Sequence, residues 1–229
     1  MFVRILINLL ETCYNLIGDV MRLRNVKGAK EAIDNSLYVI NDYEKYKGEF
    51  KKIFNNDHDI HIEIGMGKGD FIINMALNNP DINYIGIEKF DSVMVRALQK
   101  LSNIDIKNLK LIRMDAMEIN NVFDEEISKM YLNFSDPWPK ERHKSRRLTS
   151  EIFLKKYDKI FKGDKFITMK TDNRKLFEYS VKSLTNYGYL IDDLSLDLYN
   201  DDISLNVQTE YEKKFVEKGN LIYMISVHK

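Results

Sequence analysis

Acidic side chains lie at the ends of three successive β-rich runs in the chain. Glu63 lies near the end of the first run, Glu88 near the end of the second, and Asp115 just after the third. If the runs are parallel strands, their carboxyl ends meet at one edge of a sheet, and the three carboxylates lie close together there. Carboxylates in that position can accept hydrogen bonds from ribose hydroxyls and from an adenine amine, so together they predict an adenosine site. Taken alone, Glu88 and Asp115 could each cap a helix or lie in a solvated loop.

A glycine-rich bend follows Glu63. Gly65 and Gly67 lie where the first run passes into a helical pattern, and glycine lets the backbone approach a ligand closely beside the free N–H groups of a helix start. The dinucleotide fingerprint G-x-G-x-x-G is incomplete, because Asp70 occupies the third glycine position. Glu63 would also repel a pyrophosphate and attract a cationic amino-acid group. The bend therefore favours S-adenosylmethionine over NAD; a glycine turn without a ligand is the alternative.

A proline-rich segment, Asp136-Pro137-Trp138-Pro139-Lys140, follows the fourth β-rich run. Because proline disfavours helical backbone in the residue before it, we expect Asp136 and Trp138 to be extended and the loop to be stiff. A stiff loop can hold a reacting group in line; alternatively, its tryptophan only packs on the core. The stretch from Lys140 to Arg147 contains five basic residues and one acid. That charge suits phosphate binding, with a solvated basic loop as the alternative.

Alternating β-rich and helical stretches must position these residues. Strands are predicted at residues 60–64, 84–87, 109–114, 129–134, 165–170, 190–196 and 221–227. Helices are predicted at residues 70–77, 92–101, 149–161 and 173–184. This cadence predicts an α/β fold with a parallel sheet. The last two strands have no clear helical pattern between them, which suggests an antiparallel hairpin.

The composition limits the class of protein. The 229 residues include 35 basic and 35 acidic residues, and 44% are hydrophobic, enough for the core of one domain. The single cysteine, Cys13, excludes an intramolecular disulfide framework and a cysteine zinc cluster, and it fits a reducing, intracellular setting. His58 and His61 have no cysteine partners, so we expect no metal site. The neutral charge means that a nucleic acid would be held by local basic patches.

The amino end differs from the rest of the chain. Residues 1–20 are apolar, but Glu11 interrupts the apolar run after Leu10 and no signal-cleavage site follows, so neither a signal peptide nor a membrane anchor fits. The segment is either an amphipathic surface helix or sequence upstream of a true start at Met21. We therefore expect an extension over 1–20 and a single domain over 21–229. Residues 21–30 contain four basic residues and no acid, a pattern typical of a solvated tail.

The motifs occur in an order that resembles the bacterial tRNA (guanine-N7-)-methyltransferase family. The resemblance runs from about Met21 to Lys229 through EIGMGKGDF, GIEK, MDA, SDPWPKERHKSRR, KTDN and TEYEKKF. It implies a class I methyltransferase fold, Rossmann-like, with a seven-stranded, mostly parallel sheet, helices on both faces and a C-terminal antiparallel hairpin. It also implies S-adenosylmethionine as cofactor, tRNA as substrate and a cytoplasmic location. The extension over 1–20 and the absence of a proline in Val26–Ala29 depart from the family pattern.

The resemblance also assigns roles to residues. It implies that the cofactor is bound by Glu63, Gly65, Gly67, Glu88, Asp115 and Asp136. Asp136 is in addition the implied catalytic residue. Substrate-contacting positions of the family match Lys140, Asp172, Thr209, Glu210, Tyr211 and Glu212. The RNA-interacting stretch matches Arg142, His143, Lys144, Ser145, Arg146 and Arg147.

The implied reaction suits a chain with one cysteine. Guanine N7 carries a lone pair and no proton, so its methylation needs neither a general base nor a covalent enzyme intermediate, and the family expectation is guanine 46 of the tRNA variable loop. Pyrimidine C5 methylation needs a cysteine nucleophile, and Cys13 is far from every motif. Two alternatives remain: methylation of an exocyclic amine of an RNA base, and a noncatalytic RNA-binding module. We expect no membrane contact and no obligate protein partner; the sequence does not decide between monomer and homodimer.

Overall fold

The computed structural model describes residues 26–201 and 206–229, so the predicted extension over 1–20 lies outside the described residues. The strands are β1 (Ile60–Ile64), β2 (Asn83–Glu88), β3 (Leu109–Arg113), β4 (Ile127–Asn133), β5 (Phe161–Thr171), β6 (Leu190–Ser195) and β7 (Tyr223–His228). The α-helices are α2 (Ala29–Asp34), α3 (Lys51–Phe54), α4 (Asp70–Asn78), α5 (Asp91–Leu101), α6 (Ile119–Val122), α7 (Glu151–Tyr157), α8 (Arg174–Asn186) and α9 (Glu210–Val216). The described residues also form short 3-10 helices at η1 (Tyr43–Tyr46), η2 (Ala116–Glu118) and η3 (Glu141–Arg146).

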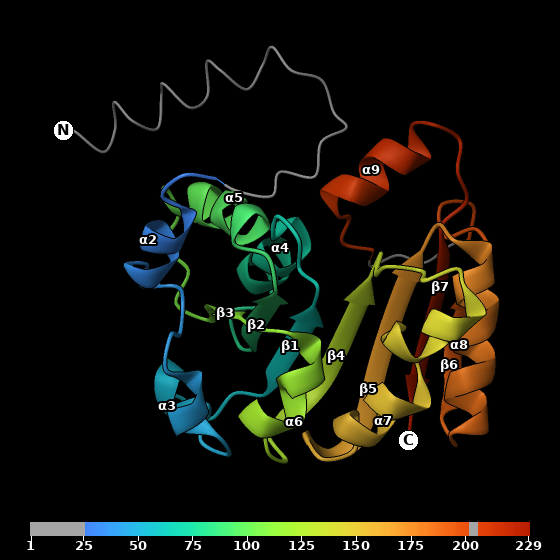
Figure 1. Cartoon of the computed structure of the whole chain (residues 1–229), viewed down its shortest axis with the longest axis horizontal. Helices are drawn as coiled ribbons and strands as arrows, with labels where there is room; N and C mark the ends of the chain where they lie inside the picture. The colour runs from blue at the N-terminus through green and yellow to red at the C-terminus, as the bar shows by residue number, and fades with distance from the viewer. Residues whose placement is uncertain (1–25, 202–205) are drawn as a thin grey trace.

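The strands form one seven-stranded sheet in the order β3-β2-β1-β4-β5-β7-β6. Strands β1 to β5 are parallel, and β7 is antiparallel to both β5 and β6. The predicted fold class is therefore confirmed (Figure 1). The prediction failed to identify α9, which lies between β6 and β7 in the chain. Its seven residues are too few for a clear apolar period, and the only sequence signal is a capping box from Thr209 to Glu212.

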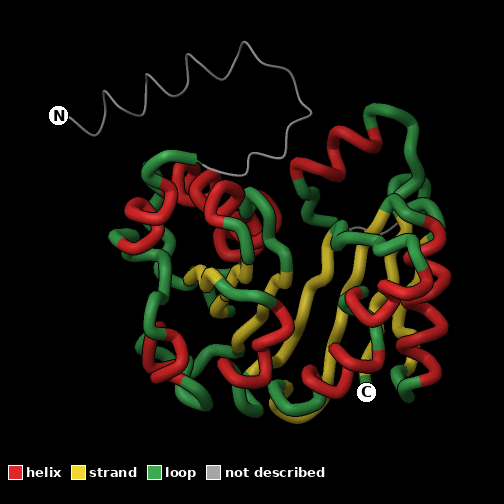
Figure 2. Tube along the Cα trace, in the orientation of Figure 1, coloured by secondary structure: helices red, strands yellow, loops and turns green. Residues whose placement is uncertain are grey.

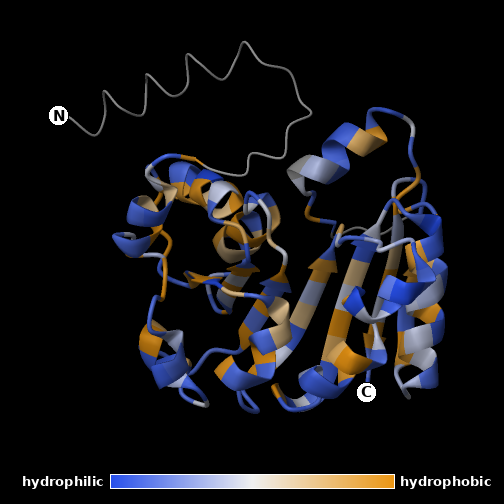
Figure 3. Cartoon of the chain, viewed as in Figure 1, coloured by the Kyte–Doolittle hydropathy of each residue, from blue (hydrophilic) through white to orange (hydrophobic). Residues whose placement is uncertain are grey.

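Helices cover both faces of the sheet, and the sheet separates the core into two clusters of buried side chains. Ile60, Ile62 and Ile64 of β1 belong to the core on the face that α6, α7 and α8 cover. Because side chains alternate along a strand, His61 and Glu63 point to the opposite face, where α2, α4 and α5 pack. Figure 2 shows the strands as one twisted layer between these helices, and Figure 3 shows hydrophobic residues concentrated along the strands.

The position of α9 determines where a ligand can bind. In Figure 1 it lies above the carboxyl ends of the parallel strands, opposite α4 and α5. Phe215 and Val216 of α9 pack on a small third cluster formed by Leu198, Ile222 and Met224. A space at the carboxyl edge of the sheet is therefore bounded by the β1–α4 bend on one side and by α9 on the other. Within residues 26–201 and 206–229, no helix combines the length and apolarity that a membrane span requires.

Candidate active site

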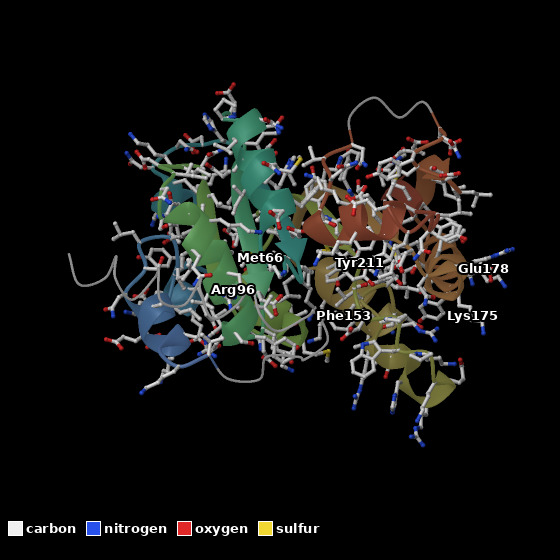
Figure 4. All side chains as sticks on the ribbon, turned by 90° about the horizontal axis from the view of Figure 1, so that it is seen from above. Met66, Arg96, Phe153, Lys175, Glu178 and Tyr211 are labelled. Carbon is white, nitrogen blue, oxygen red and sulfur yellow. The ribbon has the colours of Figure 1, made fainter. Side chains whose placement is uncertain are left out.

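A cavity of about 240 Å³ lies at the carboxyl ends of β1 and β4. Figure 4 looks down on this edge and shows Met66 and Tyr211 on its two sides, beside α4 and on α9. The lining comes from the glycine bend, the start of α4 and α5, the end of β4, and α9: Glu63, Gly65, Met66, Gly67, Lys68, Asp70, Phe71, Val93, Asn133, Phe134, Thr209, Tyr211 and Lys214. The predicted residues Glu63, Gly65, Gly67, Thr209 and Tyr211 are thus brought together around one space.

The glycine bend has a backbone that other residues rarely adopt. The φ angles of Gly65, Gly67 and Gly69 are +76°, +58° and +80°, all in the left-handed region. A Cβ atom on Gly69 would lie 2.9 Å from the Cβ of Ala97, so this glycine also allows α4 to pack closely on α5. The bend therefore requires glycine for two reasons: the positive φ angles of its backbone and, at Gly69, the close packing of α4 on α5.

Glu63 carries a buried carboxylate at the base of the cavity. Its side chain is 1% exposed, and Oε1 accepts a 2.9 Å hydrogen bond from Nδ2 of Asn133. Burial raises the pKa of Glu63 to about 7, although the Asn133 hydrogen bond and the charge of Lys170 act in the opposite direction. Neither Oε2 of Glu63 nor Oδ1 of Asn133 has a hydrogen-bond partner among the described residues. The base of the cavity thus offers two buried, unused acceptors.

Glu88 ties the second strand to the glycine bend. Its Oε2 accepts a 3.2 Å bond from the backbone N–H of Gly67, while Oε1 accepts from the N–H groups of Lys89 and Phe90 at 2.8 and 2.9 Å. Burial raises the pKa of Glu88, the three backbone bonds oppose that rise, and the charge of Asp136 adds to it. The effect of Asp136 on the pKa of Glu88 indicates that Asp136 lies near the carboxyl end of β2.

Asp115 caps a short helix, which is the alternative role that the sequence allowed for this residue. It precedes η2 and accepts a 2.9 Å bond from the N–H of Met117, and its other oxygen forms a 2.6 Å ion pair with Lys89. Burial alone would raise the pKa of Asp115, but the hydrogen bonds from Lys89 and Met117 outweigh it and the pKa is lowered. Asp115 is therefore ionised and close to the Glu88 loop, although it does not line the cavity.

The loop after β4 departs from the predicted backbone. Trp138 has a φ of +41°, so the expectation of extended backbone at this residue is wrong. A positive φ in a bulky residue before proline is strained, and strain of this kind is found mostly at functional sites. Arg147 accounts for it, because its Nε and Nη2 donate 3.1 Å bonds to the carbonyls of Pro137 and Trp138. The side chain of Arg146 lies over the Trp138 ring at 4.8 Å.

The basic residues after this loop have two different environments. Arg147 is 9% exposed and its guanidinium also stacks 4.3 Å from the ring of Tyr179, so it orders the loop from within. Arg142, Lys144 and Arg146 are exposed on η3, with Lys144 in a surface ion pair with Glu141. Ser145 also lies on this exposed turn, and Lys140 and His143 are joined by a 2.8 Å backbone bond at its start. An exposed basic surface therefore adjoins the loop that carries Asp136.

The predicted substrate segment on α9 also divides in two. Tyr211 faces the cavity and its ring lies 5.1 Å from that of Phe134. Thr209 caps α9 with Glu212, whose side chain is fully buried instead of facing the cavity. Glu210 is the first residue of α9. Asp172 follows β5, half-buried, and burial raises its pKa.

Glu212 is bound to a residue that the sequence analysis did not select. Lys170, 4% exposed at the end of β5, forms a 2.7 Å ion pair with Glu212 and donates 2.9 Å bonds to Asn206 Oδ1 and Val207 O. Burial lowers the pKa of Lys170, and the charge of Glu212 limits that fall. Lys170 belongs to the KTDN motif, but the motif does not reveal its partner. Together with Asn133, Lys170 is what sequence reasoning missed at this site.

Comparisons with known proteins agree with this geometry. Residues 57–225 match the family model described as "Putative methyltransferase". The tRNA (guanine-N(7)-)-methyltransferases of Bacillus licheniformis and Bacillus subtilis are 50% and 49% identical to this chain; each alignment covers 90% of it and 97% or 98% of the relative. That of a Geobacillus species is 52% identical, over 90% of this chain and 95% of the relative.

Solved structures show the same fold at low identity. An antibiotic-related methyltransferase matches with a TM-score of 0.63 and 19% identity, over 79% of this chain and 93% of that one. A SAM-dependent methyltransferase from Aquifex aeolicus matches with a TM-score of 0.52 and 12% identity, over 88% and 97%. The family model, however, matches more than half of the chain, and the alignments with the three relatives each cover 90% of it. The chain therefore belongs to the tRNA (guanine-N7-)-methyltransferase family.

Proposed function

We propose that this chain transfers the methyl group of S-adenosylmethionine to N7 of a guanine in tRNA. The observation that carries the proposal is the cavity at the carboxyl edge of the sheet, whose buried carboxylate at Glu63 has an unused oxygen. An exposed basic turn adjoins it through the loop that carries Asp136. Family membership at about 50% identity supports the same activity. Residues 21–229 would act as one methyltransferase domain.

The residues present fit the cofactor. Glu63 can accept from an ammonium group, and the bend at Gly65 and Gly67 lets the backbone approach the ligand. Glu88 and Asp115 would bind the ribose and the adenine, although their present backbone bonds must be shared or exchanged for this. When bound, the cofactor supplies an electrophilic methyl group on a sulfonium. No described residue needs to supply more than binding and orientation.

The protein contributes mainly position and charge. Since guanine N7 has no proton to lose, the transfer needs no base, and aligning the reacting atoms can contribute about 7–11 kcal/mol. Asp136 is exposed at the start of a loop that Arg147 and two prolines hold in place. Its carboxylate would stabilise the positive charge that moves to the purine ring, or orient the base through its N–H groups. Tyr211 and Thr209 lie on the other side of the cavity and would contact the base.

The exposed part of η3 would bind the tRNA backbone. Lys140, Arg142, Lys144 and Arg146 place positive charge beside the reacting loop, with His143 and Ser145 on the same turn. Asp172, Glu210 and Glu212 would act with Tyr211 on the substrate side, Glu212 by holding α9 rather than by contact. By family expectation the target is guanine 46 in the variable loop. A tRNA substrate also supports a cytoplasmic location.

The direct test uses unmodified tRNA and labelled S-adenosylmethionine. Borohydride reduction and aniline treatment cleave RNA at N7-methylguanosine, so we expect the labelled product to be cleaved at one site. Asp136→Asn, which should give labelled product much more slowly, serves as the matched comparison. A labelled product that resists cleavage would exclude N7, and nucleoside mass spectrometry would then show an exocyclic N2 or N6 product. Absence of any labelled product would favour a noncatalytic RNA-binding role.

A further inference from the structure

Two buried acceptors at the base of the cavity have no donor within the described protein. Asn133 is the last residue of β4 and its side chain is 5% exposed. Its Oδ1 and the Oε2 of Glu63 are both shielded from solvent and without a partner among the described residues. Both residues line the cavity. Buried polar atoms in folded proteins almost always have a partner, so two orphans in one cavity indicate a ligand that supplies donors.

The orientation of the Asn133 amide follows from its neighbour. The NH₂ end of the amide faces Glu63 and donates a 2.9 Å bond to its Oε1, an arrangement that suits an ionised Glu63 because an ionised carboxylate only accepts hydrogen bonds. The carbonyl end of Asn133 is then turned away from Glu63, and its Oδ1 has no partner among the described residues. Glu63 and Asn133 therefore present two acceptor atoms as one unit.

This pair of acceptors selects for a cation with several donors. An ammonium group has three N–H donors and a positive charge that compensates an ionised Glu63, whereas a hydroxyl has one donor and no charge. Lys170 lies near Glu63 and helps to keep it ionised, but the amine of Lys170 is already bonded to Glu212, Asn206 and Val207. Lys170 therefore does not satisfy the two orphan acceptors, which have no partner among the described residues and can accept from a positively charged group of a ligand.

We propose that Asn133 is a cofactor-binding residue, whose Oδ1 accepts a hydrogen bond from the α-ammonium of S-adenosylmethionine together with Oε2 of Glu63. The inference rests on the proposed function, because it assumes that the cavity binds S-adenosylmethionine. Because Asn133 stands three residues before Asp136 on the same chain segment, one short stretch both anchors the amino-acid end of the cofactor and carries the reacting loop. The donor edge of a guanine base is the competing occupant; if it binds there instead, Asn133→Ala leaves the affinities for both cofactor analogues unchanged, and the inference is wrong.

The test compares two ligands that differ by one amino group. S-adenosylhomocysteine has the α-ammonium, and 5′-S-(3-carboxypropyl)-5′-thioadenosine is the same molecule without it. Calorimetry should show that the wild-type protein prefers the first by at least about 100-fold, as expected for two hydrogen bonds to a charged group. Asn133→Ala should weaken S-adenosylhomocysteine about tenfold and leave the deaminated ligand within about twofold. Asn133→Ser, which retains a smaller acceptor, should lie between them and serves if the alanine variant does not fold.

Asn83→Ala is the matched control. Asn83 is also fully buried, but it lies at the amino end of β2, where it bonds to Asn56 at 2.7 Å. It should change stability and leave the ratio of the two affinities unchanged. If Asn133→Ala loses the same factor in affinity for both ligands, Asn133 only packs against its neighbours, and the inference is wrong. If Glu63→Gln keeps the full preference for the amino group, the amino group does not bind at Glu63, and the proposed cofactor site fails together with the inference.

Discussion

The ion pair between Lys170 and Glu212 predicts a large and non-additive effect on stability. The two side chains are 4% and 0% exposed, and Nζ and Oε2 are 2.7 Å apart. Lys170→Met leaves a buried Glu212 carboxylate whose remaining donors are the hydroxyl of Tyr199, the amide of Asn206 and the N–H of Thr209. Removing one partner of such a pair costs about 3–5 kcal/mol, because the other charge stays buried without compensation.

A double-mutant cycle also requires the variant that removes the charge of Glu212. Glu212→Gln keeps a side chain that can complete the capping box with Thr209, but it removes the charge and replaces one of the two acceptor oxygens by an NH₂ group. It leaves Lys170 with the oxygens of Asn206 and Val207, and we expect a cost of similar size. In the double variant neither residue is charged, so its cost should fall below the sum of the single costs by about 2 kcal/mol or more.

Urea unfolding, followed by circular dichroism, measures these four stabilities. The control is the exposed pair Arg174–Glu178 on α8, 2.9 Å apart with side chains 75% and 56% exposed. Its cycle should give a coupling of only about 0.3–0.5 kcal/mol. Additive costs for Lys170 and Glu212 would refute the reasoning, since they would mean that neither charge depends on the other. The single variants should also raise KM for tRNA, because Tyr211 is carried on the same helix.

Four further predictions concern the site. Burial raises the pKa of Glu63 from 4.5 to about 7, so in the ligand-free protein the stability that Glu63 contributes should be fully present below pH 4.5 and should be lost, by up to about 3 kcal/mol, as the pH rises through 7. Glu63→Gln should remove that loss in urea unfolding at pH 8, and identical pH profiles would contradict the assignment. Asp136→Asn should slow single-turnover methylation by about 100-fold, and an unchanged rate would exclude Asp136 from the chemistry. Arg142→Ala with Arg146→Ala should lower the slope of log affinity for tRNA against log salt by about 1 to 2 in filter binding; an unchanged slope would place the RNA elsewhere. Arg147→Lys should lower kcat with that slope unchanged, and a lowered slope would show instead that Arg147 contacts phosphate.

The elements of the sheet were predictable because each strand carries its own signal. The bounds of β1 were predicted exactly, since alternating isoleucines and a glycine bend define both ends. The backbone of Trp138 was not predictable, because a tertiary bond from Arg147 overrides the local preference before proline. The cap role of Asp115 could be named only as an alternative, since a cap and a ligand contact use the same residue type.

Lys170 and Asn133 were missed because their place in the site is determined by strand register. The pairing of β4 with β5 places Asn133 beside Lys170, and the pairing of β1 with β4 places Glu63 beside Tyr131, two residues before Asn133. These registers bring three polar side chains to one face. No local pattern in the sequence reports which residues of distant strands are neighbours, so a buried lysine in KTDN and an asparagine before the reacting loop carry no signal of their own.

The connection between β6 and β7 has a consequence for how recognition can change. Strand β7 runs antiparallel to its neighbours, so β6 ends and β7 begins at the edge that holds the cavity. The connection that contains α9 therefore leaves and re-enters the sheet at the same edge, where the Lys170–Glu212 ion pair and the packing of Phe215 and Val216 hold α9 in place. Its length and composition can vary without changing the order of the strands. Changes in the exposed residues of α9 could therefore alter the rim of the cavity while the order of the strands stays the same.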